Sequence, residues 1–270
     1  MTGNKRRCPM KWIDCSCGIG YRTVNSDIVN HEFFLIREQV EQARHAEELL
    51  ETLDFCGIAG AAVYHATMID VDPGYGNAKL MEETAKAPER LIPTWTILPA
   101  VTDEEFAPEP LFNRMKQSGV RLLRAYPERN RYLLNAVTMG EQLDAISAAR
   151  IPLYLSPSTG WEHIYSVLEQ FPELTVIVHN YGLWSHARFL YPLLRTYRNV
   201  YIECGDMQTA GELKQICGKF GSERILFGSD FPSNNIGGPL ATVIGSGIGQ
   251  ADIKNIACGN IERLLSEVRL

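Results

Sequence analysis

The chain has 270 residues, of which 45% are hydrophobic and 21% charged, and its formal net charge is −6. This composition is typical of a globular protein and excludes disorder as the dominant state. The acidic balance argues against a nucleic-acid partner, which needs a basic surface to contact phosphates. Seven cysteines, few and odd in number, do not indicate a disulfide framework. With neither an apolar run of about 18 residues nor a signal peptide, we expect a cytoplasmic protein without a membrane partner.

Apolar runs of strand length recur along the chain, and each later one precedes a helical pattern. Several are continuously apolar, such as LTVIVH at residues 174–179, which is typical of strands buried on both faces of a parallel sheet. The eight predicted strands span residues 12–17, 58–65, 91–98, 120–126, 151–156, 174–179, 200–204 and 225–230.

Helix starts are predicted between these strands by four Thr-x-x-Glu pairs, which fit the capping box. The pairs begin at Thr102, Thr138, Thr159 and Thr209. No linker-like stretch divides the chain, and the most irregular part, residues 234–249, follows the eighth strand. The alternation predicts one domain over residues 1–270, a single α/β (β/α)8 TIM barrel, regular or distorted, with extra C-terminal helices. An open doubly wound sheet is the alternative.

A barrel of this kind builds its active site at the C-terminal ends of its strands. Polar side chains at those ends therefore define the candidate site. They are Cys15, Cys17, His65, Trp95, Arg124, Tyr126, Ser156, His179, Glu203, Asp206 and Asp230. Among them, Trp95 and Ser156 are candidates for contacting a substrate. The other histidines, His31, His45, His163 and His186, fall in helix or loop contexts and are expected to be structural or exposed.

Cys15 and Cys17 stand two residues apart on the first strand, so we expect both side chains on one face, with Ser16 pointing away. Two interpretations are open. The thiols chelate one soft metal ion, or they are small, buried core residues. Because the eighth strand of a closed barrel neighbours the first, Asp230 would stand beside both cysteines. Cys15, Cys17 and Asp230 are therefore the candidate metal ligands.

His179 and Asp230 are the candidate catalytic residues. A histidine at the catalytic end of a strand has a pKa near 6.5, which suits proton transfer. For Asp230 the alternative is a turn or a helix cap. Arg124 and Tyr126, with Arg129 and Arg131 in the next loop, provide a fork for a substrate carboxylate, or belong to a solvated basic loop.

The second half of the chain carries the motifs VHNYG at residues 178–182, ILFGSDFP at 225–232 and NIERL at 260–264. In these motifs the chain resembles the amidohydrolase superfamily. The resemblance is to the TIM-barrel branch of metal-dependent hydrolases and decarboxylases related to aminocarboxymuconate semialdehyde decarboxylase. It covers nearly the whole chain.

The chain also departs from the pattern of that family. Members open with Asp-x-His-x-His, whose two histidines bind a divalent metal, whereas residues 14–18 here read DCSCG. The fifth strand ends in Ser156 where members keep another histidine ligand. His179 and Asp230 match the sixth-strand histidine and the eighth-strand aspartate. The resemblance implies that His179 is an acid–base or ligand residue and that Asp230 activates water or binds metal.

From these residues we predict a hydrolase that cleaves a C–N or C–O bond of a small carboxylated or cyclic amide or lactone. Asp230 would activate water and His179 would transfer a proton. A divalent metal, zinc if thiolates bind it, would lower the pKa of that water, or the pair would act without metal. The alternatives are a non-oxidative decarboxylase of the same superfamily and a non-catalytic barrel that binds a ligand or partner. The expected partners are a small-molecule substrate and a second copy of the chain.

Overall fold

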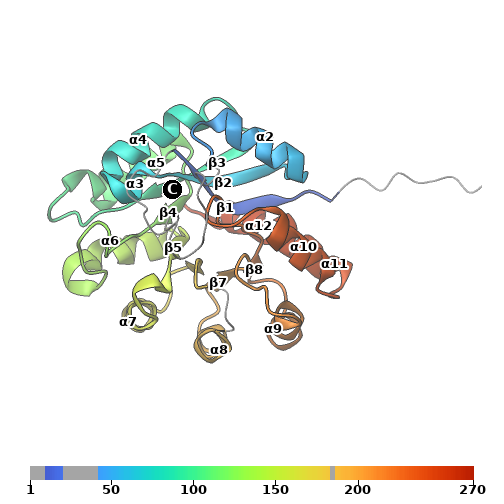
Figure 1. Ribbon diagram of the computed structural model, residues 1–270. Helices are drawn as coiled ribbons and strands as arrows, with labels where there is room; N and C mark the ends of the chain where they lie inside the picture. Colours follow the sequence, from blue (N-terminus) through green and yellow to red (C-terminus); the bar gives the residue numbers. More distant parts are fainter. Residues whose placement is uncertain (1–9, 21–41, 183–185) are drawn as a thin grey trace, which may run out of the picture.

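Eight parallel strands form one sheet in which each strand pairs with the next along the chain. The computed structural model describes residues 10–20, 42–182 and 186–270, and its strands surround a common axis with helices outside (Figure 1). The strands are β1 (Ile13–Ile19), β2 (Gly60–His65), β3 (Leu91–Thr96), β4 (Leu122–Arg124), β5 (Leu153–Leu155), β6 (Val176–Val178), β7 (Val200–Glu203) and β8 (Ile225–Leu226). Each coincides with a predicted strand, so the predicted (β/α)8 barrel is confirmed.

The sheet closes between its last strand and its first. The Cys15 amide donates to the Phe227 carbonyl oxygen over 2.8 Å. Beyond β8, the Gly18 amide donates to the Phe231 carbonyl oxygen over 2.6 Å, and Cys17 forms a parallel bridge with Phe231. Closure therefore brings the residues that follow β8 beside β1, as the predicted barrel requires.

Helices follow the strands and cover the outside of the barrel (Figure 1). They are α2 (Ala46–Cys56), α3 (Thr67–Asp70), α4 (Pro73–Thr84), α5 (Pro108–Ser118), α6 (Ala136–Ala148), α7 (Glu162–Gln170), α8 (Ala187–Thr196) and α9 (Glu212–Phe220). The predicted extra C-terminal helices are also present. They are α10 (Gly237–Gly245), α11 (Gln250–Lys254) and α12 (Asn260–Glu267), with a π-helical turn, η3 (Asn255–Gly259), between the last two.

The predicted capping boxes are wrong in detail, although helices begin near all four. Asn135 caps α6, where its side chain accepts from the amides of Val137 and Thr138. The 3₁₀ turn η1 (Glu104–Phe106) has Asp103 at its N-cap, and α7 and α9 begin after Trp161 and Gly211. A Thr-x-x-Glu spacing occurs by chance inside a first turn, and a better acceptor one turn earlier, such as Asn135, displaces it.

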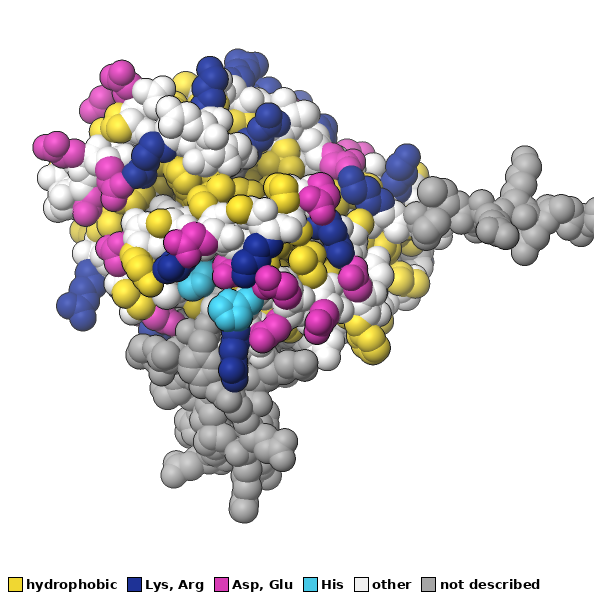
Figure 2. Space-filling view, turned by 90° about the horizontal axis from the view of Figure 1, so that it is seen from above, with side chains coloured by type: hydrophobic (Ala, Val, Ile, Leu, Met, Phe, Trp, Pro, Cys, Tyr) yellow, Lys and Arg dark blue, Asp and Glu magenta, His cyan; other side chains and the backbone are white. Residues whose placement is uncertain are grey.

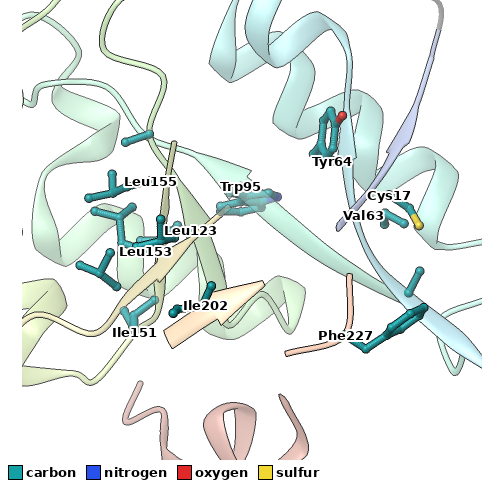
Figure 3. Close-up of a cluster of buried hydrophobic side chains, with 14 of the residues drawn as sticks. Cys17, Val63, Tyr64, Trp95, Leu123, Ile151, Leu153, Leu155, Ile202 and Phe227 are labelled. Atoms are coloured by element: carbon teal, nitrogen blue, oxygen red, sulfur yellow. The ribbon is translucent and has the colours of Figure 1, made fainter. Parts of the chain in front are cut away.

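Strand side chains alternate between two buried layers. The larger outer layer lies between the sheet and the helices, and Figure 3 shows part of it, including Val63, Leu123, Leu153 and Phe227. The smaller inner layer lies inside the barrel and contains residues such as Ala62, Leu122 and Tyr154. Continuous apolar runs in the sequence reflect this burial on both faces.

The N-terminal end of the barrel is filled by apolar side chains. Ile261 and Leu264 of α12 pack in the inner layer with Ile13 at the start of β1 and with Leu226 of β8. Polar side chains that enter the barrel from the strand interiors can therefore meet a ligand at the other end. We call that C-terminal end of the strands the barrel mouth.

Charges of both signs are mixed on the face of the molecule that carries α2 and α4 (Figure 2). Lys86, just after α4, pairs with Glu47 of α2 over 3.0 Å and with Glu83 of α4 over 2.8 Å. Within the described ranges, no helix has both the length and the apolar content needed to cross a membrane.

Candidate active site at the barrel mouth

A cavity of about 320 Å³ lies at the barrel mouth, among residues that follow β2, β4, β5, β6 and β8. Four residues of the predicted site line it, namely Tyr126, Ser156, His179 and Asp230. A wider hollow of about 850 Å³ lies between α2 and residues 231–235, and neither His179 nor Asp230 lines it. The smaller cavity is the candidate active site because the acid–base residues line it.

Asp230 stands four residues after β8 with a positive φ of 55°, a conformation that few non-glycine residues adopt. Its side chain is buried, and Ser16 Oγ donates to its Oδ1 over 3.5 Å. Burial, and then repulsion from Asp206, raise the pKa of this carboxyl to about 7, against opposing effects of Arg124 and Ser233. Such strained backbone and a shifted pKa cluster at functional sites.

His179 follows β6, is buried, and lines the same cavity as Asp230. Its ring meets that of Tyr154 edge-on, with centroids 5.5 Å apart. Both ring nitrogens lack a hydrogen-bond partner among the described residues. Burial, reinforced by the positive charge of Arg124, lowers the pKa of His179 well below its usual value. The imidazole is therefore neutral at pH 7 and keeps one donor and one acceptor for a ligand.

Arg124 ends β4 on the inner side of the barrel and is fully buried. Its guanidinium lies over the ring of Tyr154 at 4.1 Å and that of Tyr64 at 4.7 Å. Nε donates to Thr94 Oγ1 over 2.9 Å and Nη2 to Ser16 Oγ over 3.3 Å, whereas Nη1 has no partner among the described residues. Burial would lower the pKa of Arg124, but the surrounding tyrosines raise it above its usual value, so the group stays charged.

The end of β1 differs from its prediction because a β-bulge interrupts the strand. Asp14 lies opposite Ala61 and Cys17 opposite Val63, so β1 holds one residue more than β2 between these pairs. Cys15 packs in the inner layer, whereas Cys17 packs in the outer layer. The predicted same-face arrangement of Cys15 and Cys17 is therefore wrong.

The bulge also turns Ser16 into the barrel, where it contacts Arg124 and Asp230. One carboxylate oxygen of Asp14, Oδ1, accepts from the Ser16 amide over 2.9 Å and from the Ser229 amide over 3.0 Å. These two bonds fix the bulge to the segment after β8. A period-two pattern in a sequence does not reveal such an insertion, because the extra residue changes the face of everything after it.

Both thiols at this end of β1 are in their neutral form. Burial, followed by the nearby Asp14 carboxyl, raises the pKa of Cys15 and of Cys17 well above the usual thiol value. The Cys17 Sγ lies 3.9 Å from Ser229 Oγ, and the Cys15 Sγ lies 4.0 Å from the Ile13 carbonyl oxygen. A metal ion binds the thiolate rather than the thiol.

The resemblance implies a divalent metal, but the residues at the barrel mouth do not fit one. In the parts of the chain that the structure describes, no three His, Cys, Asp or Glu side chains gather around a possible metal position. Cys15, Cys17 and Asp230 are thus not brought together. The Arg124 guanidinium donates to Ser16 Oγ, and that hydroxyl in turn donates to Asp230, so a permanent positive charge already lies one hydroxyl away from Asp230.

Trp95 does not line the cavity, contrary to its predicted role. It pairs with Leu123, and both side chains lie in the outer layer by strand alternation. Arg114 of α5 covers the Trp95 ring at 5.4 Å. A position near the end of a strand therefore does not by itself place a side chain in the cavity, because alternate residues of a strand face the helices.

Two further acidic residues stand near the cavity with separate roles. Glu203 is buried inside the barrel, where burial and the charges of Asp230 and Asp14 raise its pKa well above the usual value. Asp206 accepts from the amides of Tyr181 and Gly182 over 2.7 and 2.9 Å, and so fixes the backbone just after His179.

His163 lines the cavity, although its sequence context predicts a structural or exposed residue. It belongs to the first turn of α7, which a short 3₁₀ turn, η2 (Pro157–Thr159), carries over the end of β5. Burial lowers the pKa of His163. Tyr64, at the end of β2, also lines the cavity, and its position near a strand end could have indicated this. Arg129 of the predicted fork, in the loop after β4, lines the cavity too. His31 lies outside the described residues.

The fold and the site together define a (β/α)8 barrel with acid–base side chains at the C-terminal ends of its strands. The family described as amidohydrolase matches residues 26–266, and the chain belongs to this family. The predicted membership is confirmed. A comparison with curated proteins gives no match.

Several solved structures share the fold. An uncharacterised TIM-barrel protein from Bordetella bronchiseptica is 17% identical with a TM-score of 0.71, over 95% of this chain and 99% of that one. The 5-carboxyvanillate decarboxylase from Sphingomonas paucimobilis is 16% identical with a TM-score of 0.70, over 95% and 99% of the two chains. A 5-carboxyvanillate decarboxylase from Novosphingobium aromaticivorans, with bound manganese and a nitrobenzoic acid, is 13% identical with a TM-score of 0.75, over 96% and 97%.

Proposed function

We propose that the chain is a non-oxidative decarboxylase of small cyclic carboxylic acids, and that Asp230 delivers the proton that replaces the carboxyl group. The observation that carries the proposal is the buried Asp230 carboxyl in the cavity, with its pKa of about 7. An acid that holds its proton near neutral pH is suited to general-acid catalysis. The two decarboxylases of the same fold support this reaction class over the predicted hydrolysis.

In the proposed step, the bond between a ring carbon and the substrate carboxylate breaks, and its electron pair stays on the ring while CO2 leaves. Asp230 donates its proton to that carbon and regains one from water. One proton is consumed for each CO2 released, so the step needs no oxidant or reductant. The positive charge of Arg124 beneath the cavity stabilises the negative charge that develops on the ring.

The other residues of the lining suit a small, flat, hydroxylated acid. Neutral His179 offers a donor and an acceptor, and Ser156 offers a hydroxyl that donates to the Asn180 carbonyl over 3.0 Å. Tyr64 and Tyr126 provide ring surfaces. A volume of about 320 Å³ is near the small end of the range for ligand sites, which fits a single ring with its substituents.

Hydrolysis of a lactone or amide is the second candidate, favoured by the same pKa of Asp230. At pH values above about 7 this carboxyl is ionised and can accept a proton from water, with neutral His179 as the proton donor to the leaving group. The two candidates make opposite demands on Asp230. Decarboxylation requires its protonated form, and hydrolysis requires its ionised form.

The test measures CO2 release from hydroxylated benzoic acids, and ring opening or amide cleavage from a panel of aromatic lactones and amides. Decarboxylation by Asp230 predicts a rate that falls as pH rises through about 7, whereas hydrolysis predicts a rate that falls as pH drops through that value. A rate on aromatic acids that is independent of pH from 5 to 9 would remove Asp230 from the role of proton donor.

A further inference from the structure

The strongest unexplained feature of the barrel interior is a buried cation at its centre. The Arg124 guanidinium lies among side chains from β1, β2, β3 and β5, through its contacts with Ser16, Tyr64, Thr94 and Tyr154. These contacts hold it from several sides, so its position is fixed. Neither Thr94 nor Ser16 offers a negative charge, and no salt bridge of the described residues includes Arg124.

Unsatisfied polar atoms surround this cation. Arg124 Nη1, both ring nitrogens of His179 and Glu203 Oε2 are buried without a hydrogen-bond partner among the described residues. Leaving such groups unpaired destabilises a fold, and a charged group most of all. His179 belongs to the cavity lining, and it shares the Tyr154 ring with Arg124 as a neighbour. The unpaired ring nitrogens of His179 therefore belong to the cavity lining, and the unpaired Nη1 of Arg124 lies beneath it.

We infer that Arg124 supplies, from beneath the cavity, the fixed positive charge that a divalent metal supplies in related barrels, and that it makes the cavity a site for organic carboxylates. The inference rests on the same cavity as the proposed function, but it concerns binding and requires no turnover. Arg124 is a positioning residue here, because Ala125 and Tyr126 form the adjoining part of the cavity lining. Its charge attracts the acid and holds it against His179.

The same feature of β1 that removes a possible metal ligand also supports the role of Arg124. The bulge in β1 sends Cys17 to the outer layer, and Ser16 takes the inward position and accepts from the guanidinium. One rearrangement therefore removes a ligand position and creates a contact for the arginine. An arginine held between aromatic rings stays charged, whereas a buried lysine or histidine can lose its proton.

The experiment compares the affinities of benzoate and 2-hydroxybenzoate with those of their uncharged amides, by calorimetry on the full chain treated with a chelator. We expect the wild-type protein to prefer each acid over its amide by about tenfold, the value of a hydrogen bond to a charged group. Arg124→Met should reduce this preference to below about threefold while leaving amide binding in place, and Arg124→Lys should restore part of it. Arg195→Met, an exposed arginine on α8, should leave the preference unchanged.

Retention of amide binding in Arg124→Met shows that its cavity is intact, so loss of acid binding then reports the charge. A full acid preference in that variant overturns the inference, and so does failure of both acids to bind the wild-type protein.

If Arg124→Met does not fold, two measurements on the wild-type protein still test the inference. Manganese or zinc that binds in one equivalent and strengthens acid binding overturns the inference. So does a preference that vanishes between about 0.05 and 0.5 M NaCl, because an exposed charge such as Arg129 is screened and a buried one is not.

Failure of the binding test and failure of the proposed reaction are separate results. A cavity that binds acids through Arg124 but releases no CO2 keeps the inference and removes the decarboxylase. CO2 release with full acid preference in Arg124→Met keeps the reaction and removes the inference.

Discussion

At the end of β1 the chain presents two thiols and a bulge, whereas at the ends of β6 and β8 it presents an imidazole and a carboxyl. We call the first the thiol side (Cys15, Ser16 and Cys17) and the second the acid–base side (His179 and Asp230). On the thiol side every sulfur is packed in an apolar layer and protonated. On the acid–base side, His179 is buried with both ring nitrogens unpaired among the described residues, and Asp230 has a strained backbone and a raised pKa.

The difference shows which part of the barrel mouth is suited to chemistry. Packed thiols contribute to stability as ordinary small core residues do. An unpaired buried imidazole and a strained aspartate lower stability, and they are expected to persist where they serve a ligand. The acid–base side therefore carries the chemistry that we propose, and the two thiols of the thiol side belong to the core.

The activity of Asp230→Asn is expected to show the largest effect, because this substitution removes the proposed proton donor of the acid–base side. Removing the proton donor should lower the rate on any hydroxylated benzoic acid that the wild-type protein decarboxylates by about 10² to 10⁴, the usual contribution of a general acid or base. Asp72→Asn is the matched control, because Asp72 is the exposed N-cap of α4 and asparagine caps as well as aspartate. Activity within about threefold of wild type in Asp230→Asn would show that the acid–base side is not catalytic.

His179→Phe separates a functional histidine from a structural one. The substitution removes no protein hydrogen bond that the described residues show, and it keeps an aromatic ring against Tyr154. We expect the melting temperature to stay the same or rise, because an unpaired polar group is replaced by an apolar one. The rate should fall about 10²-fold. A large loss of stability with unchanged activity would make His179 a structural residue.

Asp230 also links stability to pH. Its folded pKa of about 7 exceeds the ordinary value of 3.8, so the folded state holds a proton that the unfolded state has already lost. Wild-type stability should therefore fall as pH rises from about 4 to 7 and level off above that, relative to Asp230→Asn. The slope is at most about 1.4 kcal/mol per pH unit. Denaturant unfolding of both proteins at several pH values measures it. Parallel curves would mean that Asp230 is not buried as described.

The smallest effect concerns the thiol side. Native protein exposed to a thiol reagent should be labelled at the half-buried Cys56 and Cys217 before Cys15 and Cys17, which are fully buried and protonated. Mass spectrometry after brief labelling gives the order. Early labelling of Cys15 or Cys17 would show an accessible thiolate and would restore the metal hypothesis for that side.

Much of this molecule follows from its sequence, and the missing part has a physical cause. All eight strands were predicted because burial on both faces leaves continuous apolar runs such as LTVIVH. His179, Asp230, Tyr126 and Ser156 were placed at the cavity because closure of the barrel gathers strand ends. The period-two pattern of the sequence does not reveal the β1 bulge. It therefore predicted Cys17 on the same face as Cys15, whereas Cys17 lies in the outer layer.

Other errors have a similarly local origin. Trp95 was assigned to the substrate because it stands near a strand end, although strand alternation turns it toward α5. His163 was assigned away from the site because its helical context hid the turn η2 that carries it to the cavity. The role of Arg124 as a buried cation depends on contacts with four other strand residues. Such long-range contacts are set by packing and leave no local signal.

The central claim is that the acid–base side works without a resident metal on the thiol side. It is tested most directly by turnover of protein that has been stripped by a chelator and checked for metal by elemental analysis, before and after manganese or zinc is returned. The account predicts the same rate on hydroxylated aromatic acids in all three states, and loss of that rate in Asp230→Asn. A stripped protein that is inactive until manganese or zinc restores the rate would contradict it.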